Sequence, residues 1–268
     1  MEHWRSSRDE GTLQPYAGLT FPTQMLGLVF QLKGAVVQIA GSTVLITGSN
    51  RGLGRHFAEE LVRRGAKVYG GARDVSTVDV DGVIPVEIDV TDPASVERAA
   101  QATGDVSFIV NNAGTFTGAS LLKGSLSDIA LDLDTHYLGS LHVIRAFAPQ
   151  LAAHPRSAIL NVLSLLAWVT SPDFGSYSAA KSAAWAMTNA LRLELADQRT
   201  QVSALHVGYI DTEMASHVDA DKSDPVDVVN IALDGVEAGR AEIIADESSR
   251  SIQAALSGGV PALYPELA

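Results

Sequence analysis

Tyr177 and Lys181 are the residues of this chain whose types and spacing are best suited to proton transfer. They are four positions apart, so on a helix their side chains lie on one face, a turn apart. A lysine ammonium beside a phenol favours the phenolate and lowers a pKa that is ordinarily about 10. Such a pair could serve as a general acid or base near neutral pH. The spacing alone is weak evidence, because an aromatic residue and a surface lysine often stand four positions apart.

Ser164 is the third candidate catalytic residue, because it lies just past a predicted strand at residues 158–162. Ligands of open parallel sheets bind at the carboxyl ends of the strands, where a hydroxyl can hold a carbonyl oxygen. No Gly-x-Ser-x-Gly sequence surrounds Ser164, so it is not predicted to be a nucleophile. The predicted role of Ser164 is therefore to orient a substrate.

Residues 47–54 (TGSNRGLG) form a glycine-rich segment at the first junction between a predicted strand and a predicted helix. Gly48 permits a tight turn, Gly52 lets backbone N–H groups approach a pyrophosphate, and Gly54 lets the helix pack close to the strand. A pyrophosphate there would lie at the positive end of the helix. We therefore predict a dinucleotide-binding loop with these contacts: Gly48, Ser49, Asn50, Arg51, Gly52, Leu53 and Gly54.

The residues after the second predicted strand indicate which dinucleotide is bound. An acidic residue at the tip of that strand would hydrogen-bond the adenosine ribose and select NAD. Gly71 and Ala72 offer no carboxylate, and Arg73 follows them. The guanidinium groups of Arg51 and Arg73 could clamp a 2′-phosphate, which favours NADP(H), although both could instead be solvated surface charges. NAD(H) remains the alternative if Asp74, rather than Ala72, faces the ribose.

Strand and helix patterns alternate along the chain from Gly41 onward. Strands are predicted at residues 43–46, 67–70, 83–88, 106–110, 158–162, 201–207 and 242–245, and helices at 55–64, from Pro93, and at 126–153, 176–198, 225–238 and 248–256. Apolar strands separated by helices form parallel sheets that are covered on both faces. We predict an α/β fold, a single doubly wound domain over residues 41–268 with a parallel sheet of about seven strands and helices on both faces.

Residues 1–40 differ from the rest of the chain. Residues 1–24 are polar and unpatterned, and the apolar run at 25–40 is interrupted by Lys33. That run is too short to span a membrane, and it makes a weak secretory signal. We predict a flexible N-terminal extension over residues 1–40, and no membrane span.

Composition excludes several classes of function. The 268 residues include 19 Lys and Arg against 31 Asp and Glu, a formal net charge of −12, which argues against nucleic-acid binding. The chain has no cysteine, which excludes disulfides, thiolate nucleophiles and Cys-based zinc sites. No His/Asp/Glu cluster has metal-ligand spacing, so no metal is expected, and Asp132 is interpreted as a surface carboxylate. The default expectation is a cytoplasmic protein that acts on a small molecule.

Taken together, these motifs resemble those of the short-chain dehydrogenase/reductase family over about residues 41–245. They follow the family's order: Thr47-Gly48-x-x-x-Gly52-x-Gly54, Asp89-Val90, Asn111-Asn112-Ala113-Gly114, Ser164, Tyr177-x-x-x-Lys181 and Gly208-x-Ile210-x-Thr212. The resemblance implies a Rossmann-like fold. It also implies an oxidoreductase that transfers a hydride between NADP(H) and a carbonyl or secondary alcohol.

The resemblance also implies a role for each matching residue. Tyr177 would be the general acid/base, Lys181 would bind the nicotinamide ribose and lower the tyrosine pKa, and Ser164 would orient the substrate oxygen. Further cofactor contacts would come from Asp89 and Val90 at the adenine ring, from Asn111, Ala113 and Gly114 after the fourth strand, and from Ile210 and Thr212 at the nicotinamide carboxamide.

Three positions depart from the family's pattern. His136 replaces an asparagine that holds a water behind the lysine. A histidine can donate and accept hydrogen bonds, so it could keep an altered relay or simply be buried with a satisfied partner. Val207 replaces a proline before Gly208, which changes the stiffness of the loop. Residues 213–224, where the family has its substrate lid, are short and polar, which suggests an open or partner-completed pocket.

Two other functions remain open at this point. One is a catalytically weak or inactive NADP(H)-binding sensor or regulatory protein of the same fold, which His136 favours. The other is an epimerase or dehydratase acting on a nucleotide sugar, which fits less well because such relatives carry a longer C-terminal substrate domain. The apolar residues 165–174 suggest a moderately hydrophobic carbonyl substrate. The resemblance further suggests a homodimer or homotetramer built on the helices at 126–153 and 176–198.

Overall fold

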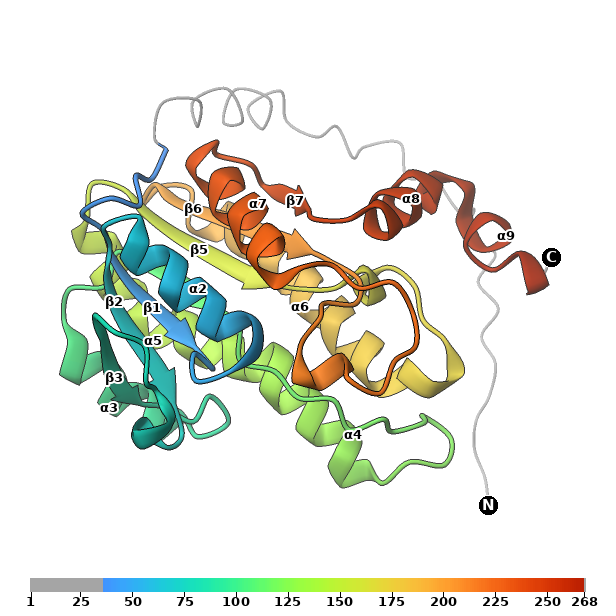
Figure 1. Ribbon diagram of the computed structural model, residues 1–268. Coiled ribbons are helices and arrows are strands. Elements are labelled where there is room, and N and C mark those ends of the chain that lie inside the picture. Colours follow the sequence, from blue (N-terminus) through green and yellow to red (C-terminus); the bar gives the residue numbers. More distant parts are fainter. Residues whose placement is uncertain (1–35, 268) are drawn as a thin grey trace, which may run out of the picture. The chain divides into compact units, whose positions relative to one another are not determined.

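The structure, a computed structural model, describes residues 36–267. Its seven strands form an all-parallel sheet in the order β3-β2-β1-β4-β5-β6-β7 (Figure 1). They are β1 (Thr43–Thr47), β2 (Lys67–Ala72), β3 (Val83–Glu87), β4 (Phe108–Asn111), β5 (Ser157–Val162), β6 (Thr200–His206) and β7 (Glu242–Ile244). The direction of strand addition reverses between β1 and β4, which confirms the predicted doubly wound fold.

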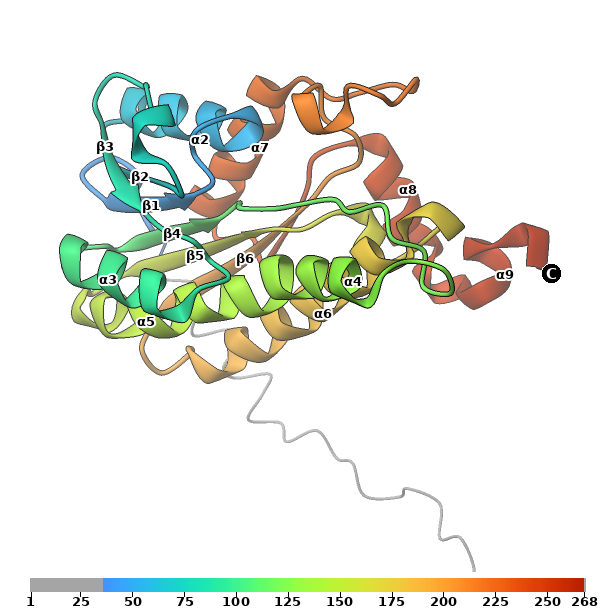
Figure 2. The same ribbon diagram turned by 90° about the horizontal axis from the view of Figure 1, so that it is seen from below.

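Helices cover both faces of this sheet, as Figure 2 shows. α2 and α7 pack together on one face, and α3, α5 and α6 lie on the other. The helices are α2 (Gly52–Arg63), α3 (Pro93–Thr103), α4 (Leu126–Leu133), α5 (Ser140–Ala153), α6 (Gly175–Glu194), α7 (Pro225–Glu237), α8 (Glu247–Ala255) and α9 (Gly259–Leu263). The short helix α9 was not predicted from the sequence.

Aspartates fix where several helices begin. Asp92 accepts a hydrogen bond from the N–H of Ala94 before α3, and Asp224 accepts one from Val226 before α7. In both helices a proline occupies the first helical position, where no N–H donor is needed. These caps set the length of the loops that leave the carboxyl ends of the strands.

Two apolar clusters fill the space between the sheet and its helices. One lies beneath α2 and α7 and includes Phe57, and the other lies beneath α3, α5 and α6 and includes Phe147. Neighbouring residues of β1 alternate between them, with Val44 and Ile46 in the first cluster and Leu45 in the second. The central strands are therefore packed on both faces, which makes them a rigid base for the loops at their carboxyl ends.

The helix predicted over residues 126–153 contains an interruption. Residues Asp134–Gly139 form a π-helical turn between α4 and α5. Such turns occur as single insertions within α-helices, frequently at functional sites. This turn carries His136, the residue at which the sequence departs from the family's asparagine.

The predicted N-terminal extension lies mostly outside the described residues. Within the described part, Val37 and Ile39 are buried in the cluster beneath α2 and α7. The backbone N–H of Ile39 also donates to the carboxylate of Glu237 at the end of α7. The folded domain therefore includes at least these residues before the predicted boundary at residue 41.

Residues 36–267 contain neither a membrane-spanning helix nor a metal-binding cluster. None of the helices there is both long and apolar enough to cross a bilayer. In the same part of the chain, no three His, Asp or Glu side chains are grouped so that they could hold a metal ion.

Candidate active site

The glycine-rich loop is bound to the end of β4 at the centre of the sheet. The Oγ1 of Thr47 accepts hydrogen bonds from the backbone N–H groups of Asn112 and Ala113, both at 3.0 Å. The side-chain amide of Asn112 donates in turn to the carbonyl oxygens of Thr47 and Gly48. Asn112 was not among the predicted site residues, because a strand-ending asparagine reads as an ordinary turn.

Each glycine of the loop has a steric reason to be glycine. Gly48 and Gly52 have φ angles of +66° and +51°, a region that residues with a side chain rarely adopt. A Cβ on Gly54 would lie 2.0 Å from the carbonyl oxygen of Gly48. The loop thus packs tightly onto the start of α2, where the first N–H groups of a helix can bind phosphate.

The other predicted loop residues have different surroundings. Ser49 is buried, and its hydroxyl donates to the carbonyl oxygen of Gly71 in β2 at 3.3 Å. Leu53 is buried in the apolar cluster beneath α2, so its side chain packs in the core. Asn50 is half-buried and Arg51 is exposed. Arg51 is therefore the loop residue whose side chain can reach outward to a ligand.

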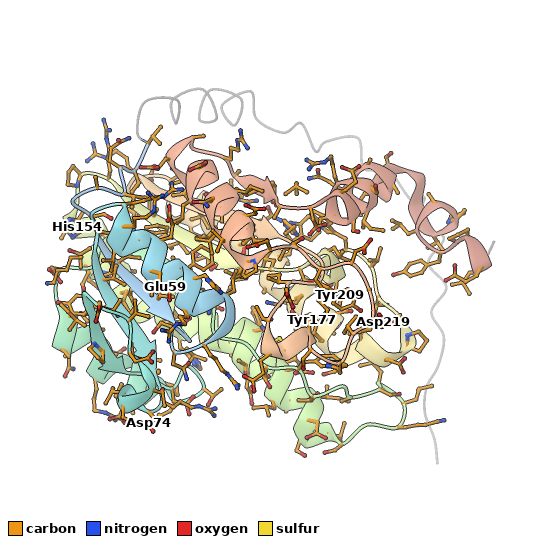
Figure 3. All side chains as sticks on the ribbon, viewed as in Figure 1. Glu59, Asp74, His154, Tyr177, Tyr209 and Asp219 are labelled. Carbon is orange, nitrogen blue, oxygen red and sulfur yellow. The ribbon has the colours of Figure 1, made fainter. Side chains whose placement is uncertain are left out.

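The end of β2 bears on the choice between NADP and NAD. Ala72 is buried there, whereas Arg73 and Asp74 are exposed. The Asp74 carboxylate accepts hydrogen bonds from the N–H and hydroxyl of Ser76, at 3.0 and 2.6 Å. These bonds lower the pKa of Asp74 and hold its carboxylate within its own turn. Figure 3 shows Asp74 at the lower left of the molecule and Tyr177 near its middle.

Asp89 and Val90 lie after β3, close to the π-helical turn. Asp89 accepts hydrogen bonds from the N–H and hydroxyl of Thr91, at 2.9 and 2.7 Å. Val90 is buried, and a Cβ on Gly139 would come within 2.9 Å of its side chain. The Val90 carbonyl oxygen lies 3.2 Å from the Nδ1 of His142. This segment is thus anchored to the helix that carries His136.

Asn111 takes part in a buried chain of side-chain hydrogen bonds. Its amide donates to the Oδ1 of Asn161 at 2.8 Å, and the amide of Asn161 donates to the Thr188 hydroxyl at 2.8 Å. Both asparagines are buried. The chain joins β4, β5 and α6, so Asn111 helps to hold α6 against the sheet.

Tyr177 and Lys181 lie on α6, within the predicted helix. The Nζ of Lys181 lies 5.5 Å from the centre of the Tyr177 ring and donates to the carbonyl oxygen of Val162 at 2.8 Å. Ser164 follows β5, and its Oγ accepts a hydrogen bond from the N–H of Leu166 at 3.1 Å. The structure therefore brings Tyr177, Lys181 and Ser164 together at the carboxyl end of β5.

The sequence predicts that Lys181 lowers the pKa of Tyr177, but the structure gives the opposite direction. Burial raises the pKa of Tyr177, the charge of Asp132 adds to that shift, and a hydrogen bond with Ser164 opposes it. Burial also lowers the pKa of Lys181 to about 7. Desolvation thus outweighs attraction between the two groups, and the described residues hold Tyr177 as a neutral phenol at neutral pH.

His136 is buried beside Tyr177. Its Nε2 lies 2.7 Å from the carbonyl oxygen of Thr115 and 3.3 Å from the Thr115 N–H, and neither contact uses Nδ1. Its ring meets the Tyr177 ring edge-on, with centres 5.0 Å apart. Burial lowers the pKa of His136 well below its usual value, and the charge of Lys181 adds to the shift. A Cβ on Gly114 would come within 2.8 Å of this ring, which explains the glycine there.

The interpretation of Asp132 as a surface carboxylate was wrong. The side chain is fully buried on α4. It accepts hydrogen bonds from the hydroxyl and the N–H of Thr117, at 2.8 and 3.3 Å. The residue faces the protein interior because α4 packs against α6, and a single carboxylate gives no sequence signal for that contact.

An aromatic cluster borders the Tyr177 ring, and we define it as Phe116, Phe174, Tyr209 and His217. The Phe116 ring centre lies 5.7 Å from that of Tyr177. It lies 5.2 Å from that of Phe174 and 6.4 Å from that of His217, with both pairs stacked. The Tyr209 ring centre lies 6.5 Å from that of Phe174. The cluster provides aromatic surroundings for any substrate that reaches Tyr177.

Ile210 and Thr212 lie on the loop after β6. Ile210 pairs with Ser223 in a short β-bridge that closes the loop on itself. Thr212 lies 3.8 Å from where a Cβ on Gly52 would be. The next residue, Glu213, forms an ion pair with Arg51 at 3.0 Å. The loop therefore contacts the glycine-rich loop through Thr212 and Glu213, and it contributes Tyr209 and His217 to the aromatic cluster.

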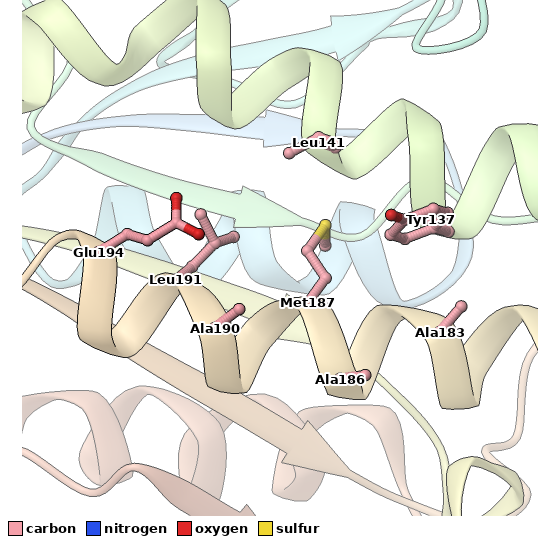
Figure 4. A pocket seen from close by; sticks show the side chains of 8 residues that line it. All are labelled: Tyr137, Leu141, Ala183, Ala186, Met187, Ala190, Leu191 and Glu194. Atoms are coloured by element: carbon pink, nitrogen blue, oxygen red, sulfur yellow. The ribbon is translucent and has the colours of Figure 1, made fainter. Parts of the chain in front are cut away.

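A groove between the π-helical turn with α5 and helix α6 is shown in Figure 4. Its lining residues are Tyr137, Leu141, Ala183, Ala186, Met187, Ala190, Leu191 and Glu194. The lining is mainly apolar, and it comes from the two helical regions, 126–153 and 176–198, on which the sequence suggested an oligomer interface. The homodimer or homotetramer stays a prediction.

Replacing Lys181 with methionine should change how stability depends on pH. The lysine pKa is about 7 when folded and about 10.4 when unfolded. Between these values the unfolded chain binds a proton that the folded chain does not, so the free energy of unfolding should rise with pH. Urea unfolding at about pH 7 and about pH 9 should show a smaller rise for Lys181→Met than for the wild type. Lys123→Met, at an exposed loop position, should leave the rise unchanged, and an unchanged rise in Lys181→Met would contradict the depressed pKa.

The comparisons with known proteins agree on a family. Residues 42–223 match the family model described as short chain dehydrogenase. A short chain dehydrogenase from Burkholderia cenocepacia, solved in complex with NADP, superposes with a TM-score of 0.82 at 36% identity and covers 86% of this chain and 99% of its own.

Two curated relatives from other organisms are also similar. An uncharacterised oxidoreductase of Escherichia coli, YbbO, is 32% identical over 190 residues, which is 68% of this chain and 71% of that protein. The NADPH-dependent 1-acyldihydroxyacetone phosphate reductase of Schizosaccharomyces pombe is 32% identical over 176 residues, 63% of this chain. That match spans 59% of the yeast enzyme, less than two thirds of its length.

Proposed function

This chain belongs to the short-chain dehydrogenase/reductase family, and we propose that it is an oxidoreductase that uses NADP(H) to interconvert a carbonyl compound and a secondary alcohol. The observation that carries the proposal is the grouping of Tyr177, Lys181 and Ser164 at the carboxyl end of β5. A proton donor, a lysine and a hydroxyl stand there at the edge of the sheet that also carries the dinucleotide loop.

Tyr177 acts as the general acid in carbonyl reduction. NADPH, when bound, supplies the hydride that adds to the carbonyl carbon. Tyr177 donates its phenolic proton to the oxygen, which completes the alcohol, and Ser164 orients that oxygen through its hydroxyl. Tyr177 is a neutral phenol at neutral pH, so it carries the proton that this step requires.

NADP(H) is favoured by the charges at the adenosine end of the site. Arg51 and Arg73 are exposed at the loop and at the end of β2, where guanidinium groups can hold a 2′-phosphate. Asp74, the residue that could select NAD, is engaged with Ser76. The Burkholderia structure in complex with NADP and the NADPH-dependent yeast reductase are consistent with this choice.

For the remaining cofactor contacts we propose the roles that the sequence motifs predict. Gly52 lets backbone N–H groups approach the pyrophosphate, Gly48 permits the turn and Gly54 the close packing of α2, and Asp89 with Val90 borders the adenine. Lys181 binds the nicotinamide ribose, and Ile210 with Thr212 holds the carboxamide. The closure of the Ile210 loop onto the glycine-rich loop supports that placement.

The proposal is tested by an initial-rate screen. Purified protein is mixed with NADPH or NADH and a panel of aldehydes, ketones and quinones, and the loss of nicotinamide absorbance is followed. We expect turnover with at least one hydrophobic carbonyl compound, and faster turnover with NADPH. Equal or faster rates with NADH would overturn the cofactor assignment.

The second candidate is an NADP(H)-binding sensor, and His136 is the observation that favours it. The Nε2 of His136 is engaged with the Thr115 backbone, so a relay behind Lys181 would have to use the other ring nitrogen. A protein that binds NADPH tightly but never oxidises it with any member of the panel would be the sensor.

Replacing Phe116 with alanine should weaken the binding of an aromatic substrate. The Phe116 ring lies beside Tyr177, and an aromatic contact between this ring and a bound substrate would contribute about 0.5–1.5 kcal/mol. The KM for phenanthrenequinone should rise about tenfold, with the KM for NADPH unchanged. Leu122→Ala, on a side chain that is 95% exposed, is the matched control. An unchanged quinone KM in Phe116→Ala would exclude the aromatic cluster as the substrate surface.

A further inference from the structure

His206, the last residue of β6, lies between the catalytic serine and a carboxylate. Its side chain is fully buried. The Nδ1 lies 3.2 Å from the carbonyl oxygen of Ser164, and the Nε2 lies 2.6 Å from the Oε2 of Glu242 on β7. None of the residue roles assigned above uses this histidine, although it contacts the backbone of Ser164 directly.

The chemistry of its two partners determines which atoms donate. A backbone carbonyl oxygen and a carboxylate are both acceptors with no proton to give. Each ring nitrogen of His206 must therefore carry a hydrogen, and only the imidazolium form carries two. A neutral ring would leave one of these contacts as two facing lone pairs in a buried site, which is unfavourable.

The surroundings of the ring can hold a positive charge. Glu242 supplies the nearest negative charge, and Trp168 stacks on the imidazole at 3.8 Å with the planes 15° apart, which suits a cation over an indole. Burial alone would raise the pKa of Glu242, but the hydrogen bond from His206 and the charge of Arg192 lower it overall. The carboxylate is therefore ionised and available to pair with the ring.

The other charged groups on the elements packed around His206 have partners of their own. Arg192 on α6 pairs with the Oε1 of Glu242 at 2.8 Å. Lys181, also on α6, donates to the carbonyl oxygen of Val162. Asp246, which follows β7, accepts hydrogen bonds from the N–H groups of Gly208 and Ser249.

The Glu242 carboxylate also connects β7 to α6, because it pairs with Arg192 on that helix. Besides Glu242, the Arg192 guanidinium donates to the carbonyl oxygens of Val202 on β6 and Ala241 before β7, at 3.1 and 2.6 Å. Arg192 lies on α6, the helix that carries Tyr177. Through Glu242 and His206, the helix bearing the proton donor is thus linked to the backbone of the serine that faces it.

We propose that His206 is a positioning residue that, as an imidazolium held by Glu242, fixes the Ser164 backbone relative to the catalytic helix. The role in turnover rests on the proposed oxidoreductase function, whereas the charge on the ring does not. We call the Glu242–His206–Ser164 contact the clamp. Loss of the clamp lets Ser164 shift relative to Tyr177, and displacements of about 1 Å in an active site can lower the rate about 100-fold.

The charge on the ring is tested by nitrogen NMR. Protein labelled with ¹⁵N-histidine is measured near neutral pH, and the His206 signals are identified by their loss in His206→Gln. We expect two nearly equal ring-nitrogen shifts with protons on both atoms. Two widely separated shifts, which indicate a neutral ring, would overturn the proposal whether or not the protein proves to be an enzyme.

The positioning role is tested by kinetics with NADPH and phenanthrenequinone. Glu242→Gln keeps the shape of the side chain but removes its charge, so kcat should fall about tenfold or more. The dissociation constant for NADPH should stay unchanged, because the clamp touches no cofactor-binding residue. His154→Gln, at the far end of the view in Figure 3, is the control and should behave as wild type.

Two outcomes of that kinetic test would contradict the positioning role. One is an unchanged kcat in Glu242→Gln. The other is a parallel loss of kcat, NADPH affinity and melting temperature, which indicates general destabilisation. If the wild type turns over neither the quinone nor any other member of the panel, the proposed function fails, and the NMR result alone decides the inference.

Discussion

Replacing Tyr177 with phenylalanine should lower kcat at least about 100-fold while leaving NADPH binding unchanged. The substitution removes only the hydroxyl, and the described residues hold that hydroxyl protonated by burying it. General acid catalysis by a positioned group contributes about 10²–10⁴ to a rate, so no other residue of the site would compensate. Initial rates measure kcat, and quenching of NADPH fluorescence measures binding.

Tyr209→Phe is the matched control for that experiment. Tyr209 belongs to the aromatic cluster, where its ring centre lies 6.5 Å from that of Phe174. It is 37% exposed and lies on the loop after β6, whereas Tyr177 lies on α6. Its hydroxyl has no role in the proposed proton transfer, so the variant should retain its kcat. If Tyr177→Phe keeps wild-type turnover, Tyr177 is not the general acid.

Removing the guanidinium groups of Arg51 and Arg73 should weaken NADPH binding about 10- to 100-fold for each residue that holds the phosphate. Hydrogen bonds to charged groups contribute about 1.5–3 kcal/mol, and about 1.4 kcal/mol corresponds to tenfold in affinity. The present ion pair of Arg51 with Glu213 does not oppose such a role. Both side chains of that pair are exposed, and surface ion pairs contribute only about 0–1 kcal/mol.

A comparison of NADPH with NADH tests whether the two arginines bind the 2′-phosphate. Arg51→Ala, Arg73→Ala and the double variant are compared for NADPH and NADH by fluorescence titration. The loss should be confined to NADPH, because NADH has no 2′-phosphate. Arg63→Ala, an exposed arginine that pairs with Glu60 on α2, should change neither affinity. Equal losses for the two cofactors would indicate a general disturbance of the loop.

The fold could be predicted from the sequence because its signals are local. Buried parallel strands are short apolar runs, and aspartate or proline marks where helices such as α3 and α7 begin. The glycine-rich loop was equally readable, since Gly48 and Gly52 are required by their backbone angles and Gly54 by its close approach to Gly48.

The burial and the side-chain contacts around the site could not be predicted from local sequence patterns, because they depend on segments that are distant in the sequence. Asp132 is buried only because α4 packs against α6. The direction of the Tyr177 pKa shift follows from burial, for which the Tyr–x–x–x–Lys spacing carries no information. The aromatic cluster and the His206–Glu242 contact join side chains from separate loops and strands.

The N-terminal boundary shows a related limit. The apolar run at residues 25–40 carries no strand or helix period, so nothing in it indicates where packing begins. Val37 and Ile39 are nevertheless buried beneath α2 and α7. Whether such a segment is buried depends on the surface that the rest of the domain offers, and the local sequence pattern carries no information on that surface.

Transfer of deuterium from NADPH to a product would show whether the protein carries out the proposed hydride transfer. Wild-type protein is incubated with NADPH that carries deuterium at the transferable position of the nicotinamide, together with the aldehyde or ketone that reacts fastest in the panel. Mass spectrometry then examines the product. We predict an alcohol that carries one deuterium on the former carbonyl carbon, and no such product with Tyr177→Phe. Tight binding of NADPH with no deuterated product from any aldehyde or ketone of the panel would contradict the assignment as a carbonyl reductase.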